Sequence, residues 1–146
     1  VAVLQLPPLP GGGGRARLLC ANCGDSRAVL CRRGGKALDL SRDHKVEDPA
    51  ERERIEAVGG RVSMGGRIEL PGGGVGGLNL SRALGDFAYK ERRDLPEHRQ
   101  LVIPCPEVKA VELEEGDEFV ALGSDGVFDV LTSEELVTRL REALHH

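Results

Sequence analysis

The sequence has few aromatic residues: among 146 residues there are three phenylalanines, one tyrosine and no tryptophan. A core must therefore be built mainly from Leu, Val, Ile and Ala, which the hydrophobic content of 40% allows. A basic surplus is also missing, since the net charge is −4, and a protein that binds nucleic acid through its phosphates needs one. No apolar run has the length of a membrane span. We therefore expect neither nucleic acid nor a membrane as partner, and at most one domain's worth of chain.

The cysteines do not indicate a zinc site. Four of them lie in apolar, strand-like surroundings: Cys20, Cys23, Cys31 and Cys105. The first two have the Cys-x-x-Cys spacing, but no second such pair and no paired histidines follow. A thioredoxin-type redox pair lies at a helix N-terminus, whereas this pair lies in a predicted strand. We interpret the cysteines as buried and reduced, which predicts an intracellular protein, cytoplasmic or nuclear; a thiol redox protein that uses Cys20 and Cys23 remains an alternative.

The first 14 residues carry three prolines and end in four glycines. They show no periodicity, and such a composition is typical of linkers. We therefore predict a disordered leader over residues 1–14 and a structured region over residues 15–146.

From Arg15 onward, short apolar runs between turn residues predict mostly antiparallel strands, so the predicted fold class is α+β. Strands are predicted at residues 18–23, 28–31, 37–40, 61–64, 67–70, 101–103, 108–113 and 119–122. Two helices are predicted from their first residues. Asp48, Pro49 and Glu51 form a capping-box pattern, with Arg54 on the water-facing side, and residues 132–135 form a second one.

The stretch from Glu118 to Asp129 combines a strand with two carboxylates. The predicted strand ends before a Ser-Asp-Gly turn that carries Asp125, and Gly126 would let this turn bend freely. If one helical turn follows, Asp125 and Asp129 lie on the same side of it. Two carboxylates beside apolar neighbours repel each other unless a cation such as Mg²⁺ or Mn²⁺ lies between them. The spacing alone favours a turn with two solvated aspartates, because Asp-Gly pairs are common in turns.

Five motifs resemble those of one enzyme family. They occur in the family's order at residues 22–29, 43–45, 53–60, 80–86 and 124–130. Together they resemble the metal-dependent Ser/Thr protein phosphatases of the PP2C (PPM) type, and residues 77–90 resemble the gamma-like branch. The resemblance covers roughly Leu18 to Leu144. It implies a fold that is part of a β-sandwich of two antiparallel sheets flanked by helices.

The resemblance also implies an activity and a metal site. The activity is hydrolysis of phosphoserine and phosphothreonine in proteins, by water shared between two or more Mg²⁺ or Mn²⁺ ions. By motif match Asp125 is a metal ligand, and Asp129 and Asp25 hold an additional metal with it. Because the metal-bound water is the nucleophile, no catalytic residue is assigned, and the substrate-binding residues are unknown. Phosphoproteins are the implied partners, and the oligomeric state stays open.

Three further motif residues receive supporting roles. We predict that Arg82 and Asp86 form a local ion pair that orders a loop, outside the metal ligands. For His44 we predict a surface turn.

The sequence lacks several parts of the family pattern. The phosphate-clamping arginine, the Asp-Gly-His-Gly motif and the final strand with its Asp-Asn ligand have no counterpart. We therefore expect a partial domain that is weak or inactive alone. The alternative is a non-catalytic, PP2C-like interaction module.

Overall fold

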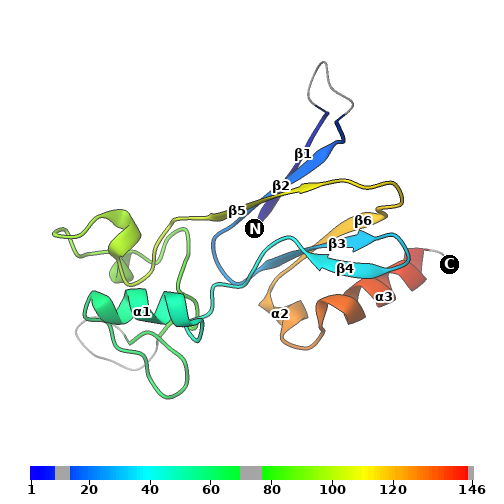
Figure 1. Ribbon diagram of the computed structural model, residues 1–146. Helices are drawn as coiled ribbons and strands as arrows, with labels where there is room; N and C mark the ends of the chain where they lie inside the picture. The colour runs from blue at the N-terminus through cyan, green and yellow to red at the C-terminus, as the bar shows by residue number, and fades with distance from the viewer. Residues whose placement is uncertain (9–13, 70–76, 145–146) are drawn as a thin grey trace. The chain divides into compact units, whose positions relative to one another are not determined.

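The computed structural model describes residues 1–8, 14–69 and 77–144 (Figure 1). The chain forms two compact units. Unit 1 comprises Val1–Asn22, Ser26–Arg42 and Glu107–His146, and unit 2 comprises Cys23–Asp25 and Asp43–Pro106.

Unit 1 contains two three-stranded antiparallel sheets. The first has the order β1-β2-β5, with the bounds Ala2–Leu6, Arg17–Asn22 and Glu107–Glu112. The second has the order β4-β3-β6, with the bounds Lys36–Asp39, Arg27–Arg32 and Phe119–Gly123. Helices α2 (Asp125–Phe128) and α3 (Ser133–Leu144) follow β6. The predicted α+β class with two antiparallel sheets is confirmed.

The core of unit 1 depends on the alternation of side chains along β3. Ala28 and Leu30 pack with Leu18 and Cys20 of β2, and this contact holds the two sheets together. Residues of the other parity, Val29 and Cys31, pack instead against Val137 of α3. The second sheet therefore lies between the first sheet and the helices, as Figure 1 shows within this unit.

The first residues of the chain form a strand, so the prediction of a disordered leader is wrong for residues 2–6. The whole of β1 pairs with β2, from Ala2 opposite Ala21 to Leu6 opposite Arg17. Val3 packs onto the core between the sheets, and Pro7 and Pro8 follow directly after the strand ends. The prolines and glycines suggested a linker, and composition could not show that β2, further along the chain, would pair with these residues. Residues 9–13 of the predicted leader lie outside the described residues.

Unit 2 has little regular structure. It contains α1 (Pro49–Ala57) and the short 3-10 helices η1 (Phe87–Tyr89) and η2 (Glu97–Arg99). Its core comprises Val46, Ile55, Ile68, Ala83, Tyr89 and Val102. The strands predicted at 61–64, 67–70 and 101–103 are not strands over their described residues, because only isolated bridges form there, such as Val62 with Ile68 and Arg82 with Ile103. Their apolar side chains face a core built around α1 rather than a sheet.

The two predicted helix starts differ in outcome. At α3 the capping box is reciprocal: Thr132 Oγ1 accepts from the Glu135 N–H at 3.2 Å, and Glu135 Oε2 accepts from the Thr132 N–H at 2.8 Å. At α1, Asp48 Oδ1 accepts from the N–H groups of Ala50 and Glu51, as predicted. Glu51, however, does not complete that capping box, because its carboxylate is buried and bonded elsewhere.

Two negative findings concern only the described residues. All four cysteines are free thiols. In the same part of the chain, no helix combines the length and the apolar character that crossing a bilayer requires.

Candidate functional site

The two carboxylates at the end of β6 lie on a single helical turn. β6 ends at Gly123, Ser124 is extended, and Asp125 is the first residue of α2. Asp129 ends this helix, and its N–H donates to the Asp125 carbonyl oxygen at 2.7 Å. The helical turn on which the common side of the two aspartates depended is therefore present, and both residues are exposed.

The glycine that constrains this turn is Gly123 rather than Gly126. Gly126 lies within α2 without a positive φ, so the freedom predicted for it is not used; its N–H donates to Asp125 Oδ1 at 2.9 Å. At Gly123, an added Cβ would lie 2.9 Å from Phe128 Cε2 and 3.3 Å from Val127 Cβ. A side chain at position 123 would therefore push α2 away from β6.

Phe128 fixes α2 to the second sheet. Its ring packs onto the cluster of Val29, Cys31 and Val137, and the Arg27 guanidinium lies 4.5 Å from the ring centroid. The position of Asp125 and Asp129 therefore depends on the packing of α2 against β3 and α3 of unit 1.

Arg27 also reaches the start of α3. Its Nη1 donates to Ser133 Oγ at 3.1 Å, and Ser133 Oγ donates to Asp39 Oδ1 at 2.6 Å. Beside this chain of contacts lies an open groove of about 610 Å³ that Asp129 helps to line.

Asp25, the third predicted ligand, lies in unit 2. Its side chain is 13% exposed, and its Oδ2 lies 2.9 Å from Lys45 Nζ. The turn before it is held by His44: the Gly24 N–H donates to His44 Nδ1 at 3.2 Å, and the His44 N–H donates to the Gly24 carbonyl at 3.0 Å. His44 is completely buried, so the predicted surface role is wrong; the Gly24 N–H gives its Nδ1 a hydrogen-bond partner away from water.

Carboxylate oxygens are the donors that Mg²⁺ and Mn²⁺ prefer, so Asp125 and Asp129 fit such an ion chemically. Two donors are few, however, and neither unit gathers three or more His, Cys, Asp or Glu side chains around one point within the described residues. Asp25 belongs to unit 2 and the other two to unit 1. A metal role for the three residues stays a prediction.

Sequence reasoning missed a buried charge cluster in unit 2. Glu51 is 3% exposed, and its carboxylate accepts from Ser81 Oγ at 2.7 Å, Arg54 Nη2 at 3.2 Å and Arg82 Nε at 3.0 Å. Burial by itself raises the pKa of Glu51, but the hydrogen bonds from Arg82 and Ser81 and the charge of Arg82 outweigh it and lower this pKa to about 2. The one signal in the sequence was the position of Glu51, four residues before Ile55 on the apolar face of α1.

This cluster corrects two predictions. Arg82 binds Glu51 on α1 instead of forming the predicted ion pair with Asp86, which has a left-handed backbone (φ 51°) ahead of η1. Arg54 is half-buried rather than water-facing, because its Nη1 donates to the carbonyl oxygens of Gln100 and Leu101. The positions of Arg82 and Arg54 are both set by partners far away in the sequence.

Comparison with known proteins identifies the family. The family model described as Protein phosphatase 2C matches residues 14–146. The chain belongs to the protein phosphatase 2C family. The resemblance deduced from the five motifs is thereby confirmed.

The PP2C relatives include enzymes from distant organisms. Protein phosphatase ppm-1.G of Caenorhabditis elegans is 45% identical over 90% of this chain, and Protein phosphatase 1G of Homo sapiens is 45% identical over 83% of it. Protein phosphatase 2C 1 of Paramecium tetraurelia is 46% identical over 87% of the chain. The chain spans 25%, 21% and 40% of the length of these three relatives.

Solved PP2C structures share the fold. A phosphatase from a pathogenic strain of Toxoplasma gondii superposes with a TM-score of 0.78 and 33% identity, over 90% of this chain and 39% of the other. A serine-threonine phosphatase 2C from Toxoplasma gondii, at 23% identity and a TM-score of 0.69, covers 92% of this chain and 45% of its own, and supports the fold alone. The family is metal-dependent in general, which agrees with the oxygen donors at the end of β6.

Proposed function

We propose that this chain contributes part of a catalytic domain that removes phosphate from phosphoserine and phosphothreonine in proteins, with Mg²⁺ or Mn²⁺ as cofactor. The observation that carries the proposal is the family match over residues 14–146, which includes the turn from β6 into α2 with Asp125 and Asp129. The relatives that the chain resembles are named protein phosphatases, and the chain spans well under half of each. The activity and the phosphoprotein substrates are therefore part of the proposal.

Asp125 and Asp129 are the residues of unit 1 proposed to hold the metal, and Asp25 is the residue of unit 2. A bound divalent ion would supply an activated water and would neutralise charge on the phosphoryl oxygens. The chain itself contributes the position of the carboxylates: the packing of Phe128 holds α2, and the Gly126 N–H orients Asp125 through Oδ1. Asp25 would exchange its contact with Lys45, at 2.9 Å, for the metal or share it.

We propose weak metal binding and little turnover for the 146-residue chain. Mg²⁺ is normally held by few carboxylates together with water and substrate, so two exposed aspartates can bind it without completing a two-metal site. Neither unit supplies a third acidic, His or Cys donor at one point in its described part.

Mn²⁺ titration followed by electron paramagnetic resonance tests the proposal without relying on activity. We expect the chain to bind Mn²⁺, Asp125→Asn to weaken the binding about tenfold or more, and Glu115→Gln to leave it unchanged. Glu115 is the matched control because it is an exposed acid of unit 1 in the loop between β5 and β6.

The same samples are then assayed with a phosphothreonine peptide. Robust turnover by the 146-residue chain that Asp125→Ala abolishes would overturn the expected inactivity while supporting the enzyme class. Mn²⁺ binding that does not depend on Asp125 would instead favour the non-catalytic interaction module.

We further propose a reducing, intracellular location, cytoplasmic or nuclear. The support is chemical: Cys20 of β2 and Cys31 of β3 are buried free thiols that pack as small apolar side chains in the core of unit 1. Fractionation of cells that express a tagged chain tests this location, and recovery from the secretory pathway would contradict it.

A further inference from the structure

Unit 2 contains an apolar pocket that the metal chemistry does not use. Its volume is about 480 Å³, within the range of pockets that hold small ligands. Its apolar lining comprises Leu84, Phe87, Leu95 and Pro104. Leu84 and Phe87 are 80% and 77% exposed, although large apolar side chains gain stability from burial. Two such side chains beside one cavity indicate a surface that another molecule covers.

The backbone that presents these side chains is tied down. Between Leu84 and Phe87 the chain turns through two left-handed residues, Gly85 (φ 99°) and Asp86 (φ 51°). Lys90 Nζ holds this turn by donating to the carbonyl oxygen of Ala83 at 2.7 Å and to that of Gly85. A non-glycine residue in the left-handed region costs conformational energy, so its surroundings must hold it there.

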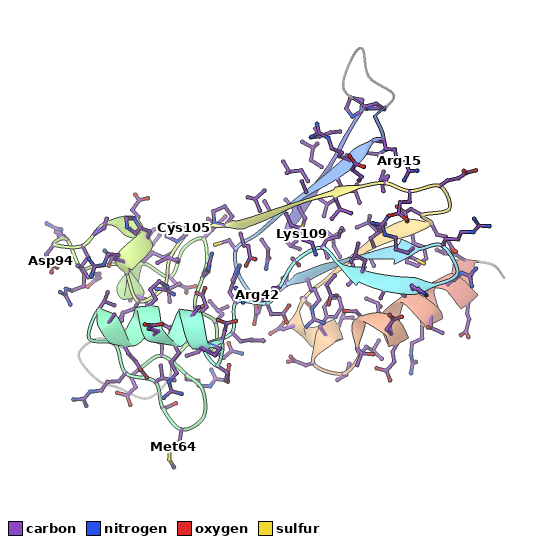
Figure 2. All side chains as sticks on the ribbon, viewed as in Figure 1. Arg15, Arg42, Met64, Asp94, Cys105 and Lys109 are labelled. Carbon is purple, nitrogen blue, oxygen red and sulfur yellow. The ribbon has the colours of Figure 1, made fainter. Side chains whose placement is uncertain are left out.

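The polar lining of the pocket is mainly basic. Lys90 contacts only carbonyl oxygens, and Arg93 is exposed without a carboxylate partner, in the part of the chain that the structure describes. Arg92 is already neutralised by Asp94, at 2.8 and 2.7 Å, and its hydrogen bonds lower the pKa of Asp94 to about 2. Figure 2 shows Asp94 at the outer end of this loop. Glu97 is the one acid among the lining residues, so Lys90 and Arg93 give the lining itself a small excess of positive charge, although the chain has a net charge of −4 and Asp86 lies nearby in the turn.

We propose that this pocket docks an acidic peptide segment, with one large apolar side chain in the cavity and flanking carboxylates on Arg93 and Lys90. The apolar walls favour a large apolar side chain in the cavity, and the cations favour carboxylates on either side of it. The docking site goes beyond the proposed phosphatase activity, because it needs neither the metal nor the residues of α2.

The probe is a fluorescein-labelled peptide of sequence Ser-Asp-Glu-Leu-Asp-Glu-Ser-Gly, titrated with the 146-residue chain at low salt and followed by fluorescence anisotropy. Two control peptides replace either the acids by Lys or the Leu by Ser. We expect saturable binding of the first peptide, and binding at least about tenfold weaker for each control.

Variants of exposed residues test the site without threatening the fold. We expect Arg93→Glu and Phe87→Ser each to weaken binding about tenfold, and Glu97→Gln to strengthen it. Met64→Ser is the matched control, because Met64 is a fully exposed apolar side chain of the same unit outside the pocket (Figure 2).

Three outcomes would overturn the proposal. They are no saturable binding of the acidic peptide, equal binding of the lysine peptide, and binding that Arg93→Glu and Phe87→Ser leave unchanged. Tighter binding of a single-stranded oligonucleotide than of the peptide would assign the surface to nucleic acid instead. Circular dichroism of each variant verifies that it is folded.

Discussion

Arg82 binds Glu51 across 31 residues of sequence, through two guanidinium nitrogens on a single carboxylate oxygen. The other carboxylate oxygen accepts from Ser81 Oγ and Arg54. This contact joins α1 to the segment just before Leu84, the first residue that lines the apolar pocket of unit 2. The charge cluster is therefore a structural support of unit 2, and its energetics can be tested directly.

Removal of the Glu51 charge should destabilise the fold. Glu51→Gln leaves Arg82 and Arg54 in a buried position without their anion, and breaking such a buried pair costs about 3–5 kcal/mol. We expect the free energy of unfolding in urea at neutral pH to fall by about this amount. Glu53→Gln is the control on the exposed side of the same helix and should change it by less than about 0.5 kcal/mol. Equal losses in both variants would show that Glu51 is not a special position.

The same carboxylate predicts a pH dependence of stability. Its pKa is about 2 in the folded chain and near its ordinary value of 4.5 in the unfolded chain. As the pH falls below 4.5, the unfolded chain takes up a proton that the folded chain does not, so unfolding becomes more favourable. The contribution of Glu51 to the free energy of unfolding should be complete above about pH 5 and lost by about pH 2. The lowering of its pKa corresponds to about 3 kcal/mol of stability.

Urea unfolding of the wild type and Glu51→Gln between pH 7 and the acid limit of folding measures this contribution. The difference between the two proteins should shrink as the pH falls. A difference that stays constant over this range would contradict the lowered pKa.

Local signals made much of the fold predictable. The short apolar run from Phe119 to Leu122 between turn residues placed β6, and the Thr132–Glu135 pattern placed the start of α3, because run length and capping depend on residues close in sequence. The spacing of Asp125 and Asp129 placed them on one side only on the condition that a helical turn follows, and α2 meets that condition. These elements form the part of the candidate site that lies in unit 1.

Long-range partners could not be predicted in the same way. Nothing near β1 in sequence shows that β2 will pair with it, and nothing near Glu51 shows that Arg82 will bury it. Likewise, the constraint on the aspartate turn comes from the Phe128 ring against Gly123, a packing contact that residue types alone do not encode. Local signals therefore suggested disorder at residues 2–6, a capping box completed by Glu51 and a flexible turn at Gly126, and tertiary contacts overrode all three.

The cysteines should react slowly, contrary to a thiol redox function. Burial raises the pKa of Cys23 above its ordinary value of 9.0, and it does the same for Cys20. Since the thiolate is the nucleophile, neither residue has the low-pKa thiolate that a redox pair requires. Iodoacetamide alkylation, followed by mass spectrometry of peptides that contain each cysteine, should accelerate only above about pH 9. Rapid alkylation of Cys20 or Cys23 at pH 7 would favour the redox alternative.

Gly123 and Gly126 should respond in opposite ways to alanine, although both lie at the aspartate turn. The Cβ of Gly123→Ala would lie 2.9 Å from Phe128, whose ring packs onto Val29 and Val137 and has little room to retreat. Overpacking of this kind costs about 1–3 kcal/mol, and it displaces the helix that carries Asp125. The Cβ of Gly126→Ala has Ser124 Oγ as its nearest neighbour, at 3.6 Å, and alanine favours a helix by up to about 1 kcal/mol over glycine.

Urea unfolding and Mn²⁺ titration of the two variants separate packing from ligand loss, since neither removes a carboxylate. We expect Gly123→Ala to unfold at lower urea and to bind Mn²⁺ several-fold more weakly, and Gly126→Ala to match or exceed the wild type in both measurements. Leu122→Ala, which truncates an exposed side chain at the end of β6, is the control for a change near the turn that leaves Phe128 in place. If Gly123→Ala were as stable as Gly126→Ala, the contact between β6 and the Phe128 ring would not position the aspartates, and their geometry would depend on α2 alone.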